Sequence, residues 1–170
     1  MLALLRKEII SFFSSAVGYI VITIFLVLNG LLLWIIACDY NVLNSWYASV
    51  AGLFMLAPWL YLFLIPAITM RTFAEEKKNG TIEILLTRPL SIPQVVSAKY
   101  LASLVLVLLS LLPTIVYYFT VYALGNPMGN IDSGSFWGAY IGLFLLASVY
   151  VSIGVFASSV SDNQVISFIV

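Results

Sequence analysis

Four long apolar runs most constrain what this chain can fold into. They cover residues 17–37, 50–69, 98–122 and 135–158. A helix of about 20 apolar residues is long enough to cross the hydrocarbon core of a bilayer. A helix also satisfies its own backbone polar groups there, where no water is present to do so. The sequence therefore predicts an all-α, polytopic transmembrane helical bundle that forms a single domain over residues 1–170.

The composition agrees with a membrane chain and argues against several classes of function. Hydrophobic residues make up 63% of the sequence and charged residues 8%, with no histidine and a single cysteine, Cys38. Histidine is the usual general base and a common metal ligand, and the sequence has no Gly-x-x-x-x-Gly-Lys-Ser/Thr loop to bind nucleotide phosphates. We therefore expect no catalytic site, cofactor or metal in this chain. We also expect no nucleic-acid partner, because the sequence has no suitable basic patch.

A fifth apolar run begins at Val165 and occupies only residues 165–170. Six residues are too few to cross a bilayer, even as a straight helix. We therefore expect the full-length product to continue this run into a complete fifth span.

The basic residues predict how the chain is oriented. Arg6 and Lys7 precede the first span, and the other five lysines and arginines fall within residues 71–99. Residues 38–49 and 123–134 contain none. Because Lys and Arg accumulate in cytoplasmic segments, we predict a cytoplasmic amino terminus and a cytoplasmic segment over residues 71–97. The predicted location is a bacterial inner membrane.

The residues before the first span have two possible interpretations. Four apolar residues, Leu2, Leu5, Ile9 and Phe12, recur at helical spacing, with the basic pair Arg6–Lys7 beside this stripe. Such a pattern is typical of an interfacial helix that lies along the inner leaflet. A simple positively charged flank that orients the first span would also explain it.

Residues 71–97 divide into short helical pieces. We expect residues 71–78 to prolong the second span and to end at Asn79-Gly80, where glycine permits a left-handed stop. Ser91 and Gln94 have the spacing of a capping box, which predicts a new helix start after Pro89. Residues 81–86 would then form a short crosswise helix able to dock into a groove of a soluble partner. A solvated loop that only sets topology is the alternative.

The same segment resembles the signature loop of the membrane subunits of type-2 ABC exporters. The resemblance is carried by the string Arg71-x-Phe73-Ala-Glu-Glu-Lys77-x-x-Gly80-Thr-x-Glu83-x-Leu-Leu-Thr87-x-Pro89-x-Ser91, with Val95, Val96 and Lys99. Over its whole length the chain is similar to gliding-motility-associated ABC permease subunits. That similarity is carried by Phe13-Ser14-Ser15, Gly18-Tyr19, Leu28-Asn29-Gly30, Tyr40-Asn41-Val42-Leu43, Leu56-Ala57-Pro58-Trp59, Leu124-Gly125-Asn126-Pro127, Gly129-Asn130-Ile131-Asp132 and Ser161-Asp162-Asn163-Gln164.

The resemblance implies a function, a fold and a set of partners. It implies the membrane-spanning permease subunit of an ATP-driven exporter associated with gliding motility, with an N-terminal interfacial helix and a cytoplasmic coupling helix. The implied partners are a separate cytoplasmic ABC ATPase, a second permease copy or related membrane subunit, and a further membrane-anchored component. The residues implied to couple to the ATPase are Phe73, Glu75, Glu76, Gly80, Thr81, Glu83, Leu85, Leu86 and Pro89.

Two other classes of function stay open at this point. One is a transporter or channel that works alone, and the other is a structural membrane scaffold of a motility or secretion machine. Proton- or ion-driven carriers usually need ionisable groups at depth in the membrane. We expect no Asp, Glu, Lys or Arg inside a complete span, which argues against the first alternative.

Overall fold

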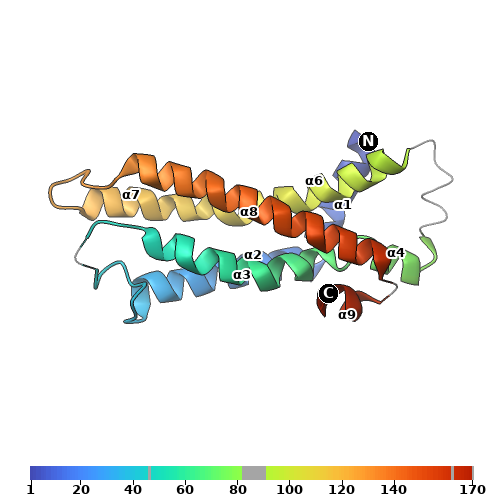
Figure 1. Ribbon diagram of the computed structural model, residues 1–170, viewed down its shortest axis with the longest axis horizontal. Coiled ribbons are helices and arrows are strands. Elements are labelled where there is room, and N and C mark those ends of the chain that lie inside the picture. The colour runs from blue at the N-terminus through green and yellow to red at the C-terminus, as the bar shows by residue number, and fades with distance from the viewer. Residues whose placement is uncertain (46, 82–90, 162, 170) are drawn as a thin grey trace.

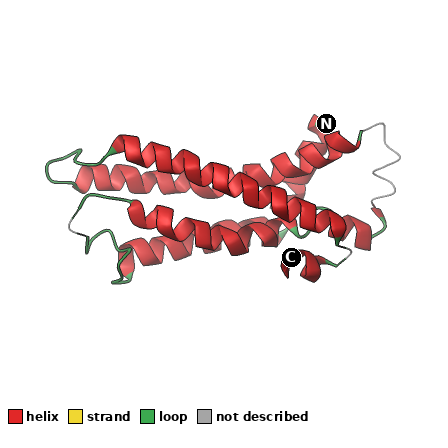
Figure 2. Ribbon diagram, in the orientation of Figure 1, coloured by secondary structure: helices red, strands yellow, loops and turns green. Residues whose placement is uncertain are grey.

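The structure is a computed structural model that describes residues 1–45, 47–81, 91–161 and 163–169. All regular elements within these ranges are helices (Figure 2). Four helical segments among them are long and apolar enough to cross a membrane: Ala16–Ile35, Ala51–Lys78, Ile92–Leu124 and Ser133–Val160. They lie side by side along the long axis of the molecule (Figure 1). The predicted all-α, multi-span fold is confirmed.

The first two helices both pack against α6, and α2 also packs against α3. Helix α1 (Leu2–Ser14) is followed by α2 (Ala16–Gly30) and a π-helical turn, η1 (Leu31–Ile35). α1 packs against α6 and buries Leu4, Glu8 and Phe12. The buried face is therefore rotated from the predicted stripe of Leu2, Leu5, Ile9 and Phe12. The physical reason is that the carboxylate of Glu8 turns inward to a buried lysine.

The second span is interrupted near its end. α3 (Ala51–Thr69) continues through Pro58 and Pro66, and the chain then makes a turn over residues 70–73 before α4 (Ala74–Lys78). The prediction of a continuous helix over residues 71–78 is thus wrong at its beginning, because a side chain of another helix binds the backbone there. Gly80 has a φ of 67°, which confirms the predicted left-handed stop.

The remaining helices complete the bundle. α6 (Ile92–Leu111) begins as predicted, with the N–H of Ser91 donating to Gln94 Oε1 at 3.2 Å. A 3₁₀ turn that contains Pro113, η2 (Leu112–Thr114), leads into α7 (Ile115–Leu124). α8 (Ser133–Val160) is capped by Asp132, and α9 (Gln164–Ile169) lies against α3, α4 and α8.

The core of the bundle is built around the contact of α3 with α8. Ala57 and Ala147 are completely buried, and small side chains of this kind let membrane helices approach closely. The ring of Tyr61 of α3 stacks on Phe25 of α2 with their centroids 4.5 Å apart. The hydroxyl of Tyr61 lies 2.9 Å from Ser110 Oγ. The buried phenol is therefore hydrogen-bonded, as an apolar surrounding requires.

Candidate functional site: a charged junction at one end of the bundle

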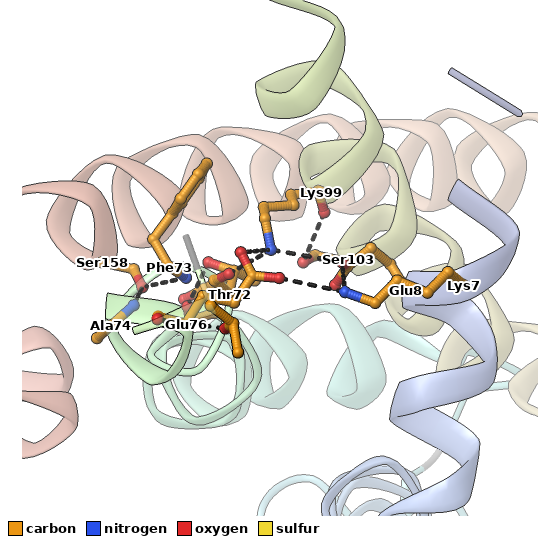
Figure 3. A network of polar contacts seen from close by, with 11 residues as sticks. Lys7, Glu8, Thr72, Phe73, Ala74, Glu76, Lys99, Ser103 and Ser158 are labelled. Carbon is orange, nitrogen blue, oxygen red and sulfur yellow. Dashed lines mark hydrogen bonds and ion pairs between the residues drawn. The ribbon is translucent and has the colours of Figure 1, made fainter. Parts of the chain in front are cut away.

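Four ionised side chains meet where α1, α4 and α6 come together (Figure 3). They are Lys7 and Glu8 of α1, Glu76 of α4 and Lys99 of α6, and we call them the charged junction. Lys99 Nζ lies 2.9 Å from Glu76 Oε2 and 3.4 Å from Glu8 Oε1. Lys7 Nζ lies 3.2 Å from Glu76 Oε1 and 3.3 Å from Glu8 Oε1. Each lysine therefore contacts both glutamates, and the four groups form a closed, formally neutral ring.

Lys99 is the inner member of this ring. Its exposed fraction is only 1%, so its ammonium group has lost most of its hydration. Besides the two carboxylates, Nζ donates a hydrogen bond to the carbonyl oxygen of Thr72 and lies 5.0 Å from the ring centroid of Phe73. A buried charge is tolerated when it is paired and hydrogen-bonded, and an aromatic face adds further attraction for a cation. Lys99 has all three kinds of partner.

Lys7 is the outer member, with 60% of its side chain exposed. Burial by itself would lower the pKa of Lys7, but the attraction of Glu8 and Glu76 outweighs it and raises that pKa above its usual value. Lys7 is therefore charged throughout the neutral range. Because exposed ion pairs contribute only about 0–1 kcal/mol, the stability of the junction depends mainly on the inner lysine.

Helix α8 makes a second, uncharged connection to the start of α4 (Figure 3). Ser158 Oγ accepts hydrogen bonds from the backbone N–H groups of Phe73 and Ala74 at 3.0 and 3.2 Å, and it donates to the carbonyl oxygen of Met70 at 3.2 Å. The first N–H groups of a helix have no partner inside that helix. Ser158 thus caps α4 from a different helix. This cap explains why the helix is interrupted over residues 70–73 and begins again at Ala74.

The junction is suited to holding helices in place rather than to chemistry. Its carboxylates are already paired with ammonium groups. Over the part of the chain that the structure describes, no group of three or more His, Cys, Asp and Glu residues could hold a metal ion. What the junction does is connect α4 to α1 and α6 by charged groups, while Ser158 connects α4 to α8.

The structure brings together some of the predicted coupling residues. Glu76 belongs to the junction, the ring of Phe73 faces Lys99 of the junction, and Glu75 is partly buried on α4. Thr81 Oγ1 donates to the carbonyl oxygen of Glu76 at 3.3 Å, whereas Gly80 is exposed and has open space where a Cβ would be. The other four, Glu83, Leu85, Leu86 and Pro89, lie outside the described residues. A coupling role for all of them stays a prediction.

Of the four residues of the charged junction, only Glu76 was among the predicted coupling residues. The expectation that no ionised residue lies inside a complete span is wrong for Lys99, which sits within the candidate span Ile92–Leu124. A signal was present, since Glu8 belongs to the charged triplet Arg6-Lys7-Glu8 in an otherwise apolar N-terminal segment, and Lys99 lies near the start of the apolar run over residues 98–122. A buried acid needs a nearby base as its partner, and a buried base needs an acid, but Glu8 and Lys99 are 91 residues apart in the sequence. Only the packing of α1 on α6 brings them together.

Comparison with protein families identifies the class of the protein. Residues 48–170 match the model of the ABC-2 family transporter protein, and this match covers most of the chain. The chain therefore belongs to the ABC-2 transporter family, as a multi-pass membrane component. Such subunits are permeases without catalytic activity of their own, and they typically pair with a cytoplasmic ATPase. No curated protein and no solved structure matches the chain.

Proposed function

We propose that this chain is the permease subunit of an ATP-driven exporter, and that a separate ATPase binds its 71–97 segment. The observation that supports this proposal is the charged junction. It ties α4, at the start of that segment, to α1 and α6 through Glu76, and Ser158 ties α4 to α8. Movement of α4 would therefore act on three other helices through contiguous polar contacts.

The finer parts of the proposal come from the resemblance described above. The permease would sit in a bacterial inner membrane with its amino terminus and its 71–97 segment in the cytoplasm. It would associate with a second permease copy or a related subunit and with a membrane-anchored auxiliary component. The exported substrate would serve gliding motility.

Replacing Leu85 and Leu86 together by aspartate tests the link to the ATPase. If these leucines contact a groove of the ATPase, the change places charge in a desolvated contact, which costs several kcal/mol at such interfaces. We expect the variant to insert into the membrane normally but to lose both ATPase binding and export-dependent function. Co-purification of the ATPase from solubilised membranes measures the binding.

The matched control replaces the same two leucines by methionine, which keeps their size and apolar character. This control should retain ATPase binding. A double aspartate variant that still binds its ATPase and still supports function would favour the solvated-loop interpretation of residues 71–97.

The proposed orientation predicts which cysteines a membrane-impermeant maleimide can reach in intact cells. In a Cys38→Ser background, the exposed Asn79 is replaced by cysteine. We expect no labelling until the membrane is permeabilised, because Asn79 would face the cytoplasm. Leu43→Cys, at a position that is 63% exposed, should be labelled in intact cells. The reverse pattern would mean that the orientation is inverted.

A further inference from the structure

We propose that the charged junction is a latch in which Glu8 is the permanent counter-ion of Lys99 and Glu76 is the releasable one. This inference rests on the proposed function only for the force that moves α4. The two glutamates look equivalent in the ring, since each contacts both lysines. The helices that carry them are not equivalent.

Glu8 and Lys99 are on long helices that are packed together. α1 has 13 residues and buries Leu4 and Phe12 beside Glu8, while α6 has 20 residues. α4 has only five residues, too few for a helix to be stable by itself. α4 also donates hydrogen bonds to Ser158 and Ser159 of α8. α4 is therefore the element that can leave.

The charges of the junction are distributed so that Glu76 can leave without making Lys99 an unpaired buried ion. When Glu76 is removed, Lys99 keeps the carboxylate of Glu8 at 3.4 Å. The excess positive charge then falls on Lys7, whose side chain is 60% exposed and is hydrated by water. Without Glu8, by contrast, release of Glu76 would leave Lys99 buried and unpaired, which is strongly unfavourable.

This difference predicts opposite effects for two equivalent substitutions. Glu76→Gln should weaken the hold on α4, so that α4 is displaced without any signal from the ATPase. Glu8→Gln should lock α4 in place, because Glu76 becomes the only carboxylate left to Lys99. We expect the released population to fall by about 100-fold or more in the Glu8 variant. A purely structural role would make both variants loosen the junction.

The experiment measures the distance between α1 and α4 with spin labels in the complete permease–ATPase complex in lipid nanodiscs. The labels replace the exposed Ile10 of α1 and the exposed Lys78 of α4, in a Cys38→Ser background. In the parent protein the distance distribution should differ between the nucleotide-free and ATP-trapped states. Glu76→Gln should show, in both states, the distance that corresponds to a displaced α4. Glu8→Gln should show, in both states, the distance that corresponds to α4 held in the junction, and it should lose export.

A rescue variant separates locking from simple damage. Glu8→Gln combined with Lys99→Met removes the buried charge together with its partner, so release no longer leaves an ion unpaired. We expect α4 to move again with nucleotide state in this double variant. If Glu8→Gln gives no monodisperse protein, two other variants still test the latch. Glu8→Asp keeps the negative charge and should behave as the parent does. The double variant should still show movement of α4 between nucleotide states.

Two results would overturn the latch: α4 moves in Glu8→Gln as in the parent, or Glu76→Gln leaves the distance unchanged. Co-purification of the ATPase is recorded on the same samples. A parent protein that does not co-purify with an ATPase would count against the proposed function. Normal ATPase binding with parental distances in both glutamine variants would count against the latch alone. The Glu76→Gln comparison can also be made on the permease without its ATPase.

Discussion

Replacing Lys99 by methionine is expected to destabilise the bundle by about 3–5 kcal/mol while leaving membrane insertion intact. The change keeps the length of the side chain but removes the only cation of the junction that is buried. Glu8, which is 7% exposed, would then have only the outer lysine as a charged partner. Thermal unfolding of the purified permease in detergent, followed by size-exclusion chromatography after heating, measures the loss.

Lys7→Met is the matched control for this prediction. It removes the other lysine of the same ring, but from a side chain that is 60% exposed. Exposed ion pairs are worth about 0–1 kcal/mol, so its thermal stability should stay close to that of the parent. Equal losses in the two variants would contradict the conclusion that burial makes Lys99 the decisive member.

Gly154→Ala is expected to destabilise the contact between α3 and α8 by about 1–3 kcal/mol. A Cβ at position 154 would lie 2.1 Å from Thr69 Oγ1 and 2.9 Å from Thr69 Cβ. The second atom belongs to the rigid base of the side chain and cannot rotate away. The two helices would have to separate, and this would lower the unfolding temperature in the same assay.

Two further variants make the Gly154 prediction specific. Gly142→Ala lies on the same helix, and a Cβ there meets nothing within 4 Å, so its effect should be neutral or slightly stabilising. Adding Thr69→Ala to Gly154→Ala removes the hydroxyl and the methyl group from the contact and should recover part of the loss. If the two substitutions were simply additive, Thr69 would not be the cause of the effect.

The contact at Gly154 also bears on the candidate site. Ser158, which caps α4, follows Gly154 by four residues on α8. The close approach of α3 and α8 at Gly154 therefore positions Ser158 next to the end of α3, where its Oγ donates to the carbonyl oxygen of Met70. We expect Gly154→Ala to disturb the cap of α4 as well as the stability of the bundle, whereas Gly142→Ala should leave both unchanged.

The sequence by itself determined the class of fold, the number of long spans and several helix ends. A bilayer requires about 20 consecutive apolar residues for each spanning helix, so the spans can be read from the order of residues alone. Gly80 and the Ser91–Gln94 pair were also predictable, because a left-handed stop and a capping box depend on neighbouring residues. The resemblance of residues 71–99 to membrane subunits of type-2 ABC exporters indicated the transporter family, which the match over residues 48–170 shows.

Only the tertiary structure decided how the charged residues are used. Glu8 ends the charged triplet Arg6-Lys7-Glu8, and Lys99 lies near the start of an apolar run. The sequence alone allows both to be topology signals or solvated residues. The capping of α4 by Ser158 and the contact of Gly154 with Thr69 likewise join residues on different helices. All three depend on the rotation and height at which one helix packs on another. That packing is set by the whole bundle, because no local pattern in a uniformly apolar helix specifies which face meets which neighbour.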